Sequence, residues 1–194
     1  MALRCFLAVG MPSPVKERLA EAVEELKKSR ADVRWVPAEN MHLTLKFLGA
    51  TEGDFVGRIA GVLSDILSSY APFYIKISGV GCFPDMRRPK IIWAGIEESR
   101  RLSDLTRDVE AGMVGLGYAA ERRAFSPHLT IGRVKSGRGV PEMISAVEKL
   151  SAAGFGDVEI KKVTLMKSEL RPAGAVYSGL AEILFGGRND VEQR

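Results

Sequence analysis

The stretch Met41-His42-Leu43-Thr44-Leu45 recurs 86 residues later as Pro127-His128-Leu129-Thr130-Ile131. Each copy is a His-x-Thr element that opens an apolar, Thr-containing run, and such a run predicts a strand. Successive side chains of a strand point to opposite faces, so the histidine and the threonine share one face while the aliphatic residues share the other. The recurrence therefore predicts two similar halves, each presenting one polar pair from a strand that is anchored in the core.

The segments around the two copies alternate between strands and amphipathic helices. Apolar residues recur with the period of a helix over 14–30, 54–70, 99–116 and 141–150. Short apolar or alternating runs predict strands over 4–9, 33–36, 42–48, 73–80, 91–96, 129–134, 158–170 and 176–185. The first half thus has the order β-α-β-β-α, the second half returns to this pattern, and a polar tail follows from Gly186.

The composition is that of a folded globular chain. Of the 194 residues, 46% are hydrophobic and 27% charged, which excludes a mainly disordered or fibrous protein. We find no bilayer-spanning apolar segment and no signal cleavage site, so we expect a cytoplasmic protein without a membrane partner. The net charge of +4 favours a polyanionic partner without identifying one. Cys5 and Cys82 lie in no ligand-like cluster, so we interpret both as buried thiols.

His42 and His128 are the only histidines of the chain, and their matched settings favour a shared catalytic task over two unrelated buried side chains. Because the ordinary pKa of histidine is about 6.5, one imidazole can accept a proton and the other can donate one near neutral pH. The hydroxyls of Thr44 and Thr130 can donate hydrogen bonds to phosphate oxygens. The pattern therefore predicts phosphodiester opening by general acid-base catalysis.

Two other kinds of catalytic site fit the sequence poorly. Two histidines, without cysteines or carboxylates at ligand spacing, fall short of the three or four donors of a metal site. Ser126 does not lie in a Gly-x-Ser-x-Gly turn, so it lacks the setting of a nucleophilic serine. We therefore expect neither a metal nor another cofactor.

Arg133 is the best candidate for a cation that holds phosphate, because a guanidinium can bind phosphate with two parallel hydrogen bonds. Strict alternation places Arg133 on the face opposite His128, but a bulge at Gly132 would redirect it. By the same alternation Lys46 shares the face of His42, where it either assists catalysis or is solvated.

Two aromatic residues and one loop have two interpretations each. Phe125, before the second His-x-Thr element, and Trp93, on the predicted strand 91–96, either stack on a base of a single-stranded RNA end or fill the core. The loop from Arg87 to Lys90 faces either a phosphate backbone or water. The sequence pattern alone does not separate these alternatives.

The whole chain resembles the RNA 2′,3′-cyclic phosphodiesterases, historically called 2′-5′ RNA ligases, of the two-histidine phosphoesterase superfamily. The resemblance rests on the opening RCFLAVGMP, the segments MHLTLKFLGAT and SPHLTIGRVK, and the strand IIWAGI. It implies an α+β fold in which residues 1–194 form a single two-lobed domain. In such a fold, two antiparallel sheets with outer helices are related by pseudo-twofold symmetry, and the active-site cleft lies between the lobes.

The resemblance also implies roles for the site residues. It makes His42 the proton donor and His128 the proton acceptor, with Thr44, Thr130 and Arg133 holding the phosphate. The implied reaction is hydrolysis of a terminal 2′,3′-cyclic phosphate to a 2′-phosphate. The implied partner is an RNA with such an end, including tRNA halves that the family joins through a 2′-5′ linkage in the reverse reaction. We also expect a monomer.

Two further functions stay open. An RNA-binding or nucleotide-binding module without catalysis would have little use for two facing imidazoles, because basic and aromatic residues suffice for affinity. A phosphodiesterase acting on small cyclic nucleotides or on ADP-ribose cyclic phosphate would need the same histidine pair but a smaller pocket. Comparing turnover of an oligonucleotide with turnover of a small cyclic nucleotide separates these enzymes.

Overall fold

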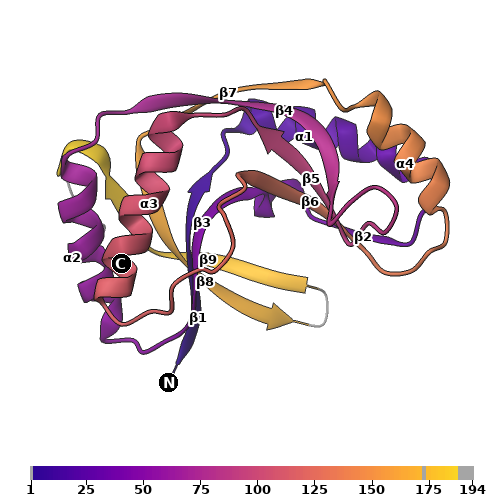
Figure 1. Ribbon diagram of the computed structural model, residues 1–194. Helices are drawn as coiled ribbons and strands as arrows, with labels where there is room; N and C mark the ends of the chain where they lie inside the picture. The colour runs from indigo at the N-terminus through magenta and orange to yellow at the C-terminus, as the bar shows by residue number, and fades with distance from the viewer. Residues whose placement is uncertain (1, 172–173, 188–194) are drawn as a thin grey trace.

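The computed structural model describes residues 2–171 and 174–187, and Figure 1 labels its helices and strands. The elements in chain order are β1 Leu3–Gly10, α1 Ser13–Lys27, β2 Val33–Trp35, η1 Ala38–Asn40, β3 His42–Thr51, α2 Phe55–Ser68, β4 Phe73–Phe83, β5 Ile91–Ile96, α3 Arg100–Gly115, β6 His128–Val134, α4 Val140–Lys149, β7 Gly154–Ile160, β8 Lys162–Arg171, β9 Gly174–Leu184 and η2 Phe185–Gly187. Most of the polar tail predicted from Gly186 lies outside the described residues.

Two groups of antiparallel strands meet edge to edge at the two histidine-bearing strands. The order across the sheet is β7-β4-β5-β6-β3-β1-β8-β9, with β2 pairing to β6 outside this path. We call β7, β4, β5 and β6 the β6 group, and β3, β1, β8 and β9 the β3 group. The two groups are paired at one position only, Leu43 with Leu129, and the strands of one group run at an angle to those of the other (Figure 1). The predicted α+β class with antiparallel sheets is confirmed.

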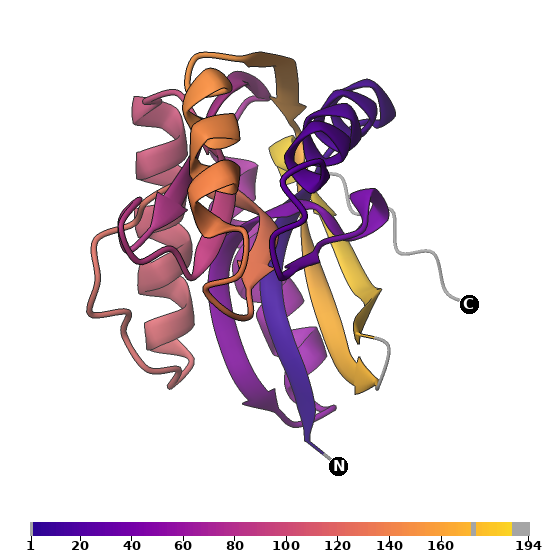
Figure 2. The ribbon, with the colours of Figure 1, turned by 90° about the vertical axis from the view of Figure 1, so that its right-hand side faces the viewer.

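The helices are exchanged between the two strand groups. Helix α1 follows β1 of the β3 group, but it packs beside α4 against β7 of the β6 group. Helix α3 follows β5 of the β6 group, but it packs beside α2 against β3. Figure 1 shows α2 and α3 together at one end of the molecule, and Figure 2 shows α1 beside α4 at the other. Each group is therefore covered by helices from both sequence halves.

The predicted apolar stripes are the buried faces of the helices. In α1 the buried residues are Val15, Leu19, Ala22, Val23 and Leu26, which are the residues that recur at helical spacing. Helix α3 begins where Ser99 accepts a hydrogen bond from the backbone N–H of Leu102 at 3.3 Å. A side chain that accepts from the first turn satisfies a donor with no partner inside the helix.

The predicted strand 158–170 is instead two strands, β7 and β8, with a break at Lys161. Strand β7 pairs with β4 and β8 pairs with β1, so the chain crosses from one end of the sheet to the other group here. Ile160 and Val163 are both fully buried on either side of the break. Buried apolar residues continue on both sides of Lys161, so the sequence pattern did not reveal the crossing.

Candidate active site

The central residue pair of the sheet places the polar residues of both His-x-Thr elements on one face. Leu43 and Leu129 pair across β3 and β6 and are almost completely buried. Alternation along each strand then turns the opposite set of side chains away from the core. That set is partly exposed and consists of His42, Thr44, His128 and Thr130, and we call the side of the sheet that carries it the histidine face. The structure thus brings together four of the predicted site residues.

The register sets how these four residues face each other. Continuing the register of the Leu43–Leu129 pair places His42 opposite Thr130 and Thr44 opposite His128. His42 and His128 are therefore diagonal neighbours, and in a regular antiparallel pair the Cα atoms of diagonal neighbours lie about 7–8 Å apart. Two imidazoles that start from diagonal positions on one face can both reach a single tetrahedral phosphate.

Both imidazoles are held in the same orientation by a carbonyl oxygen two residues earlier. Nδ1 of His42 lies 2.7 Å from the carbonyl oxygen of Asn40, and Nδ1 of His128 lies 2.7 Å from that of Ser126. Because a carbonyl oxygen only accepts, Nδ1–H is the donor in both rings. Nε2 is therefore the atom that each ring has free for proton exchange with a substrate.

The surroundings of the two rings differ. The ring of Phe6 stacks on His42 with centroids 4.8 Å apart, and Tyr177 meets the same imidazole edge-on at 5.2 Å. Burial lowers the pKa of His42, the hydrogen bond to Asn40 opposes this, and the charge of Lys16 lowers the pKa further. His128 has one edge-on aromatic neighbour, Phe83, at 5.0 Å. The more enclosed histidine is thus the one on β3.

A β-bulge brings Arg133 to the face of His128. The pairing of β6 with β5 passes from Thr130 directly to Gly132, which leaves Ile131 as an extra residue. One extra residue reverses the alternation, so Arg133 lies on the same face as His128 and Thr130. The predicted redirection of Arg133 is confirmed, and its exposed side chain is available to an anion.

Strand β2 adds a second arginine beside the first. Arg34 pairs directly opposite Arg133, and both side chains are exposed. A Cβ atom at Gly132 would lie 2.9 Å from a methyl group of Val33 and 3.0 Å from the ring of Trp35, so a glycine allows β2 to pack against β6. Nothing in the motif pointed to Arg34, because its place beside Arg133 depends on this pairing.

A matching bulge in β3 turns Lys46 away from the histidine face. The pairing of β3 with β1 passes from Thr44 directly to Lys46, which leaves Leu45 as the extra residue. Lys46 is 5% exposed, and its Nζ donates to Oε2 of Glu110 at 2.7 Å. The prediction that Lys46 shares the face of His42 is therefore wrong, because the bulge interrupts the alternation on which it was based.

The bulge in β3 also moves Phe47 onto the histidine face. The side chain of Phe47 is 68% exposed, and its ring lies 6.2 Å from that of Phe6. Phe47 follows His42 by five residues, just as Arg133 follows His128. Sequence reasoning missed Phe47, although comparing equivalent positions of the two elements would have found it. One element therefore supplies a cation and the other an aromatic ring.

The two aromatic residues with open interpretations lie in different settings. Phe125 is 36% exposed and lies on the connection between α3 and β6. The ring of Trp93 covers Gly81, where a Cβ atom would lie 2.4 Å from the indole. In the described part of the chain, Nε1 of Trp93 is buried without a hydrogen-bond partner. Trp93 is half-buried and pairs directly with Thr130 across β5 and β6, so its ring lies on the same face as the histidines and not in the core.

The loop between β4 and β5 presents its cations to solvent. Oδ1 of Asp85 accepts hydrogen bonds from the backbone N–H groups of Arg87 and Arg88 at 2.8 and 2.9 Å. The side chains of Arg87, Arg88 and Lys90 are exposed.

Residues 2–171 and 174–187 contain neither a cluster of metal-binding side chains nor a membrane-spanning helix. No group of three or more His, Cys, Asp or Glu side chains there is placed to hold a metal ion. No helix in the same part of the chain is both long and apolar enough to cross a bilayer. Cys5 and Cys82 are buried free thiols, as predicted, and burial raises the pKa of Cys82 to about 11.

The two halves of the chain each match the same family model. The model describes LigT-like phosphoesterases, and it matches residues 9–93 and 95–177, with one His-x-Thr element in each match. The chain belongs to this family. Membership of the LigT-like phosphoesterases makes it an enzyme that cleaves phosphoester bonds, which confirms the predicted class of reaction.

Relatives of this LigT-like phosphoesterase match it over more than nine-tenths of its length. An RNA 2′,3′-cyclic phosphodiesterase of Methanothermobacter thermautotrophicus is 36% identical over 93% of the chain and 97% of the relative. One of the same name from Archaeoglobus fulgidus is 35% identical over 92% and 98%. The crystal structure of a Thermus thermophilus protein superposes with a TM-score of 0.81, at 26% identity over 96% of the chain and 100% of that protein. The predicted family is thereby confirmed.

Proposed function

We propose that this LigT-like phosphoesterase hydrolyses the terminal 2′,3′-cyclic phosphate of an RNA to a 2′-phosphate. The observation that carries the proposal is the matched pair of imidazoles on one sheet face, each with Nδ1 bound to a carbonyl oxygen and Nε2 free. The names of the archaeal relatives support RNA as the substrate. The same two histidines would serve the reverse joining of tRNA halves, because a reaction and its reverse pass through one transition state.

In the proposed mechanism the two histidines move one proton each. Nε2 of His128 takes a proton from water as the water oxygen bonds to phosphorus, and the bond from phosphorus to the ribose 3′ oxygen breaks. Nε2–H of His42 gives its proton to the departing 3′ oxygen. Burial makes protonated His42 the stronger acid, because it lowers the pKa of this imidazole, and this supports the donor role.

Neighbouring side chains of the same face would hold the substrate. Thr44 and Thr130 donate hydrogen bonds to nonbridging phosphate oxygens, whose charge redistributes during the reaction. Arg133 binds the phosphate through its guanidinium, with Arg34 beside it. The exposed ring of Phe47 offers a surface on which the terminal base can stack. The phosphate would thus lie towards β6 and the base towards β3.

The lowered pKa of His42 predicts a difference between two pH profiles. In the free enzyme the donor loses its proton as pH rises through a pKa below 6.5. The negative phosphate of a bound substrate favours the imidazolium and raises this pKa. We therefore expect the alkaline limb of kcat/KM, which reports the free enzyme, at lower pH than the alkaline limb of kcat.

An NMR titration of the imidazole protons checks the pH prediction directly. The signal of His42 should titrate below 6.5 in the free enzyme. Replacing Lys16 by Met should raise its pKa, since a like charge is removed. A His42 pKa at or above 6.5, or alkaline limbs that coincide, would contradict the assignment.

The end-group assay tests the proposed function itself. The enzyme is incubated with an oligoribonucleotide ending in a 2′,3′-cyclic phosphate and, separately, with a 2′,3′-cyclic mononucleotide, and the phosphate isomer formed is identified. We expect the oligonucleotide to yield a 2′-phosphate. A 3′-phosphate product would reject the assigned direction of opening. Turnover of the mononucleotide alone would favour a phosphodiesterase for small cyclic nucleotides.

A further inference from the structure

The connection between α3 and β6 carries two adjacent arginines close to the active site. We call residues 119–125 of this connection the arginine loop. It runs from the end of α3 past β3 towards the start of β6 (Figure 1). Arg123 precedes His128 by five residues, so the two Cα atoms lie at most about 18 Å apart. The loop is therefore within a few nucleotides' reach of the catalytic imidazoles.

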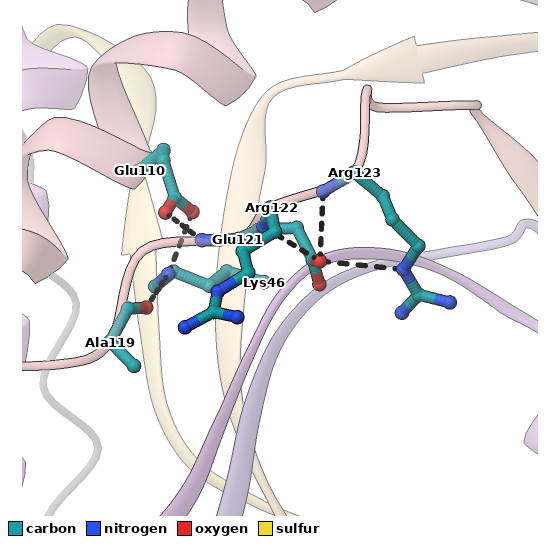
Figure 3. Close-up of polar contacts among 6 residues, drawn as sticks. All are labelled: Lys46, Glu110, Ala119, Glu121, Arg122 and Arg123. Atoms are coloured by element: carbon teal, nitrogen blue, oxygen red, sulfur yellow. Dashed lines mark hydrogen bonds and ion pairs between the residues drawn. The ribbon is translucent and has the colours of Figure 1, made fainter.

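Lys46 and Glu110 fix the beginning of the arginine loop. Nζ of Lys46 donates to Oε2 of Glu110 at 2.7 Å and to the carbonyl oxygen of Ala119 at 2.9 Å (Figure 3). The other carboxylate oxygen of Glu110 accepts from the backbone N–H of Glu121 at 2.8 Å. The bulge that removes Lys46 from the histidine face thus directs it to the loop, and one carboxylate links strand, helix and loop.

Glu121 fixes the backbone of the two arginines. Its Oε1 accepts hydrogen bonds from the backbone N–H groups of Arg122 and Arg123 at 3.0 and 3.2 Å, and from Nε of Arg123 at 3.4 Å. Figure 3 shows both arginine side chains extending away from the loop backbone. A backbone fixed before binding loses less conformational entropy when a ligand binds.

The charge of the arginine loop is not balanced within the loop. Glu110 is paired with Lys46, so Glu121, which pairs with Arg123, is the one carboxylate of the loop against the two guanidinium groups of Arg122 and Arg123. The side chain of Arg123 is 86% exposed. In the described part of the chain, no hydrogen bond or ion pair involves the guanidinium of Arg122. Two exposed cations on a fixed backbone form a surface for a polyanion.

The geometry points to a second contact surface for RNA on the arginine loop. Arg122 and Arg123 bind backbone phosphates of the nucleotides that precede the terminal cyclic phosphate, and Phe125 stacks on one of their bases. This inference rests on the proposed function, because it assumes that an RNA 3′ end occupies the histidine face. Phosphate contacts position a strand, and stacking on an exposed ring adds affinity without a sequence requirement.

The test compares two double variants that each lose two positive charges. One is R122Q/R123Q in the arginine loop. Its matched control is R100Q/R101Q, which removes two adjacent exposed arginines at the other end of α3, about 24 Å along the helix. Binding of a fluorescent eight-nucleotide RNA that ends in a 2′-phosphate is measured by anisotropy at several salt concentrations. Turnover of a 2′,3′-cyclic mononucleotide is measured in parallel.

We expect R122Q/R123Q to bind the RNA about tenfold more weakly than the wild type at low salt. The slope of log affinity against log salt should become shallower by about 1.4, because two single-strand phosphate contacts are lost. The control should keep the wild-type affinity and slope, and mononucleotide turnover should stay within about twofold in both variants.

Three results would overturn the inference, and each is separate from failure of the proposed function. Equal losses of RNA affinity in the two double variants would show that the effect comes from the overall charge of the protein and not from the arginine loop. Unchanged RNA binding by R122Q/R123Q would leave the loop without a role in binding. A large loss of mononucleotide turnover would show that the loop acts through His128 instead. If the wild type cleaves no cyclic end at all, the proposed function fails, while the binding measurement still tests the loop.

Discussion

Replacing His42 or His128 by Ala is expected to lower kcat for a cyclic-phosphate RNA end by about 10²- to 10⁴-fold, the usual contribution of a general acid or base. Both rings have Nδ1 bound to a carbonyl oxygen, which leaves Nε2 as the working atom, and alanine removes that atom. The measurement is steady-state cleavage of an oligonucleotide with a 2′,3′-cyclic phosphate at saturating substrate.

The H42A/H128A variant gives the control for this prediction. Because the two imidazoles move protons in one reaction, removing both should cost little more than removing one. Thermal unfolding of each variant checks that the fold is intact. Turnover near that of the wild type in either single variant would reject proton transfer by that histidine.

Replacing Glu110 by Ala is expected to lower the free energy of unfolding by about 3 kcal/mol, because it leaves a buried ammonium without its counter-charge. The side chain of Lys46 is 3% exposed, and without Glu110 its Nζ keeps the carbonyl oxygen of Ala119 as its described partner. For a chain of this length, such a loss lowers Tm by roughly 6–12 °C. Denaturant unfolding and a thermal scan measure both quantities.

Two controls are the replacement of the other partner, Lys46, and the removal of an exposed ion pair. Lys46→Met should cost less than Glu110→Ala, since Glu110 is 28% exposed and can be hydrated, while the Met side chain fills the same apolar space. Removing Glu97 from its exposed ion pair with Lys76 should cost below about 1 kcal/mol. If Lys46→Met proved the more damaging change, burial of the ammonium would not be the source of the effect.

The sequence predicted the features that depend on periodicity. The spacing of Val15, Leu19 and Leu26 identified the buried face of α1, and the two His-x-Thr elements predicted four polar side chains on one face. These features follow from local geometry, because a strand alternates with a period of two and a helix repeats about every 3.6 residues.

The features that the sequence did not predict depend on pairing between distant strands. Leu45 and Ile131 look like ordinary core positions in the sequence, yet each is the extra residue of a bulge. The bulge at Leu45 directs Lys46 to Glu110 and exposes Phe47. Simple alternation assigned Lys46 to the wrong face and did not identify Phe47. For Arg133 the neighbouring Gly132 gave a local signal, and the prediction of a bulge there was correct. In β3 no glycine marks the equivalent place.

The exchange of α1 and α3 between the strand groups has a mechanical consequence. The strands of the two groups are paired at a single position, Leu43 with Leu129, and so short a pairing would act as a hinge in a chain without further connections. Helices α1 and α3 instead each follow a strand of one group and pack on the other group, so they hold the two groups in a fixed relative position. We therefore expect the spacing of the two imidazoles to stay fixed during turnover, and substrates to enter a preformed site.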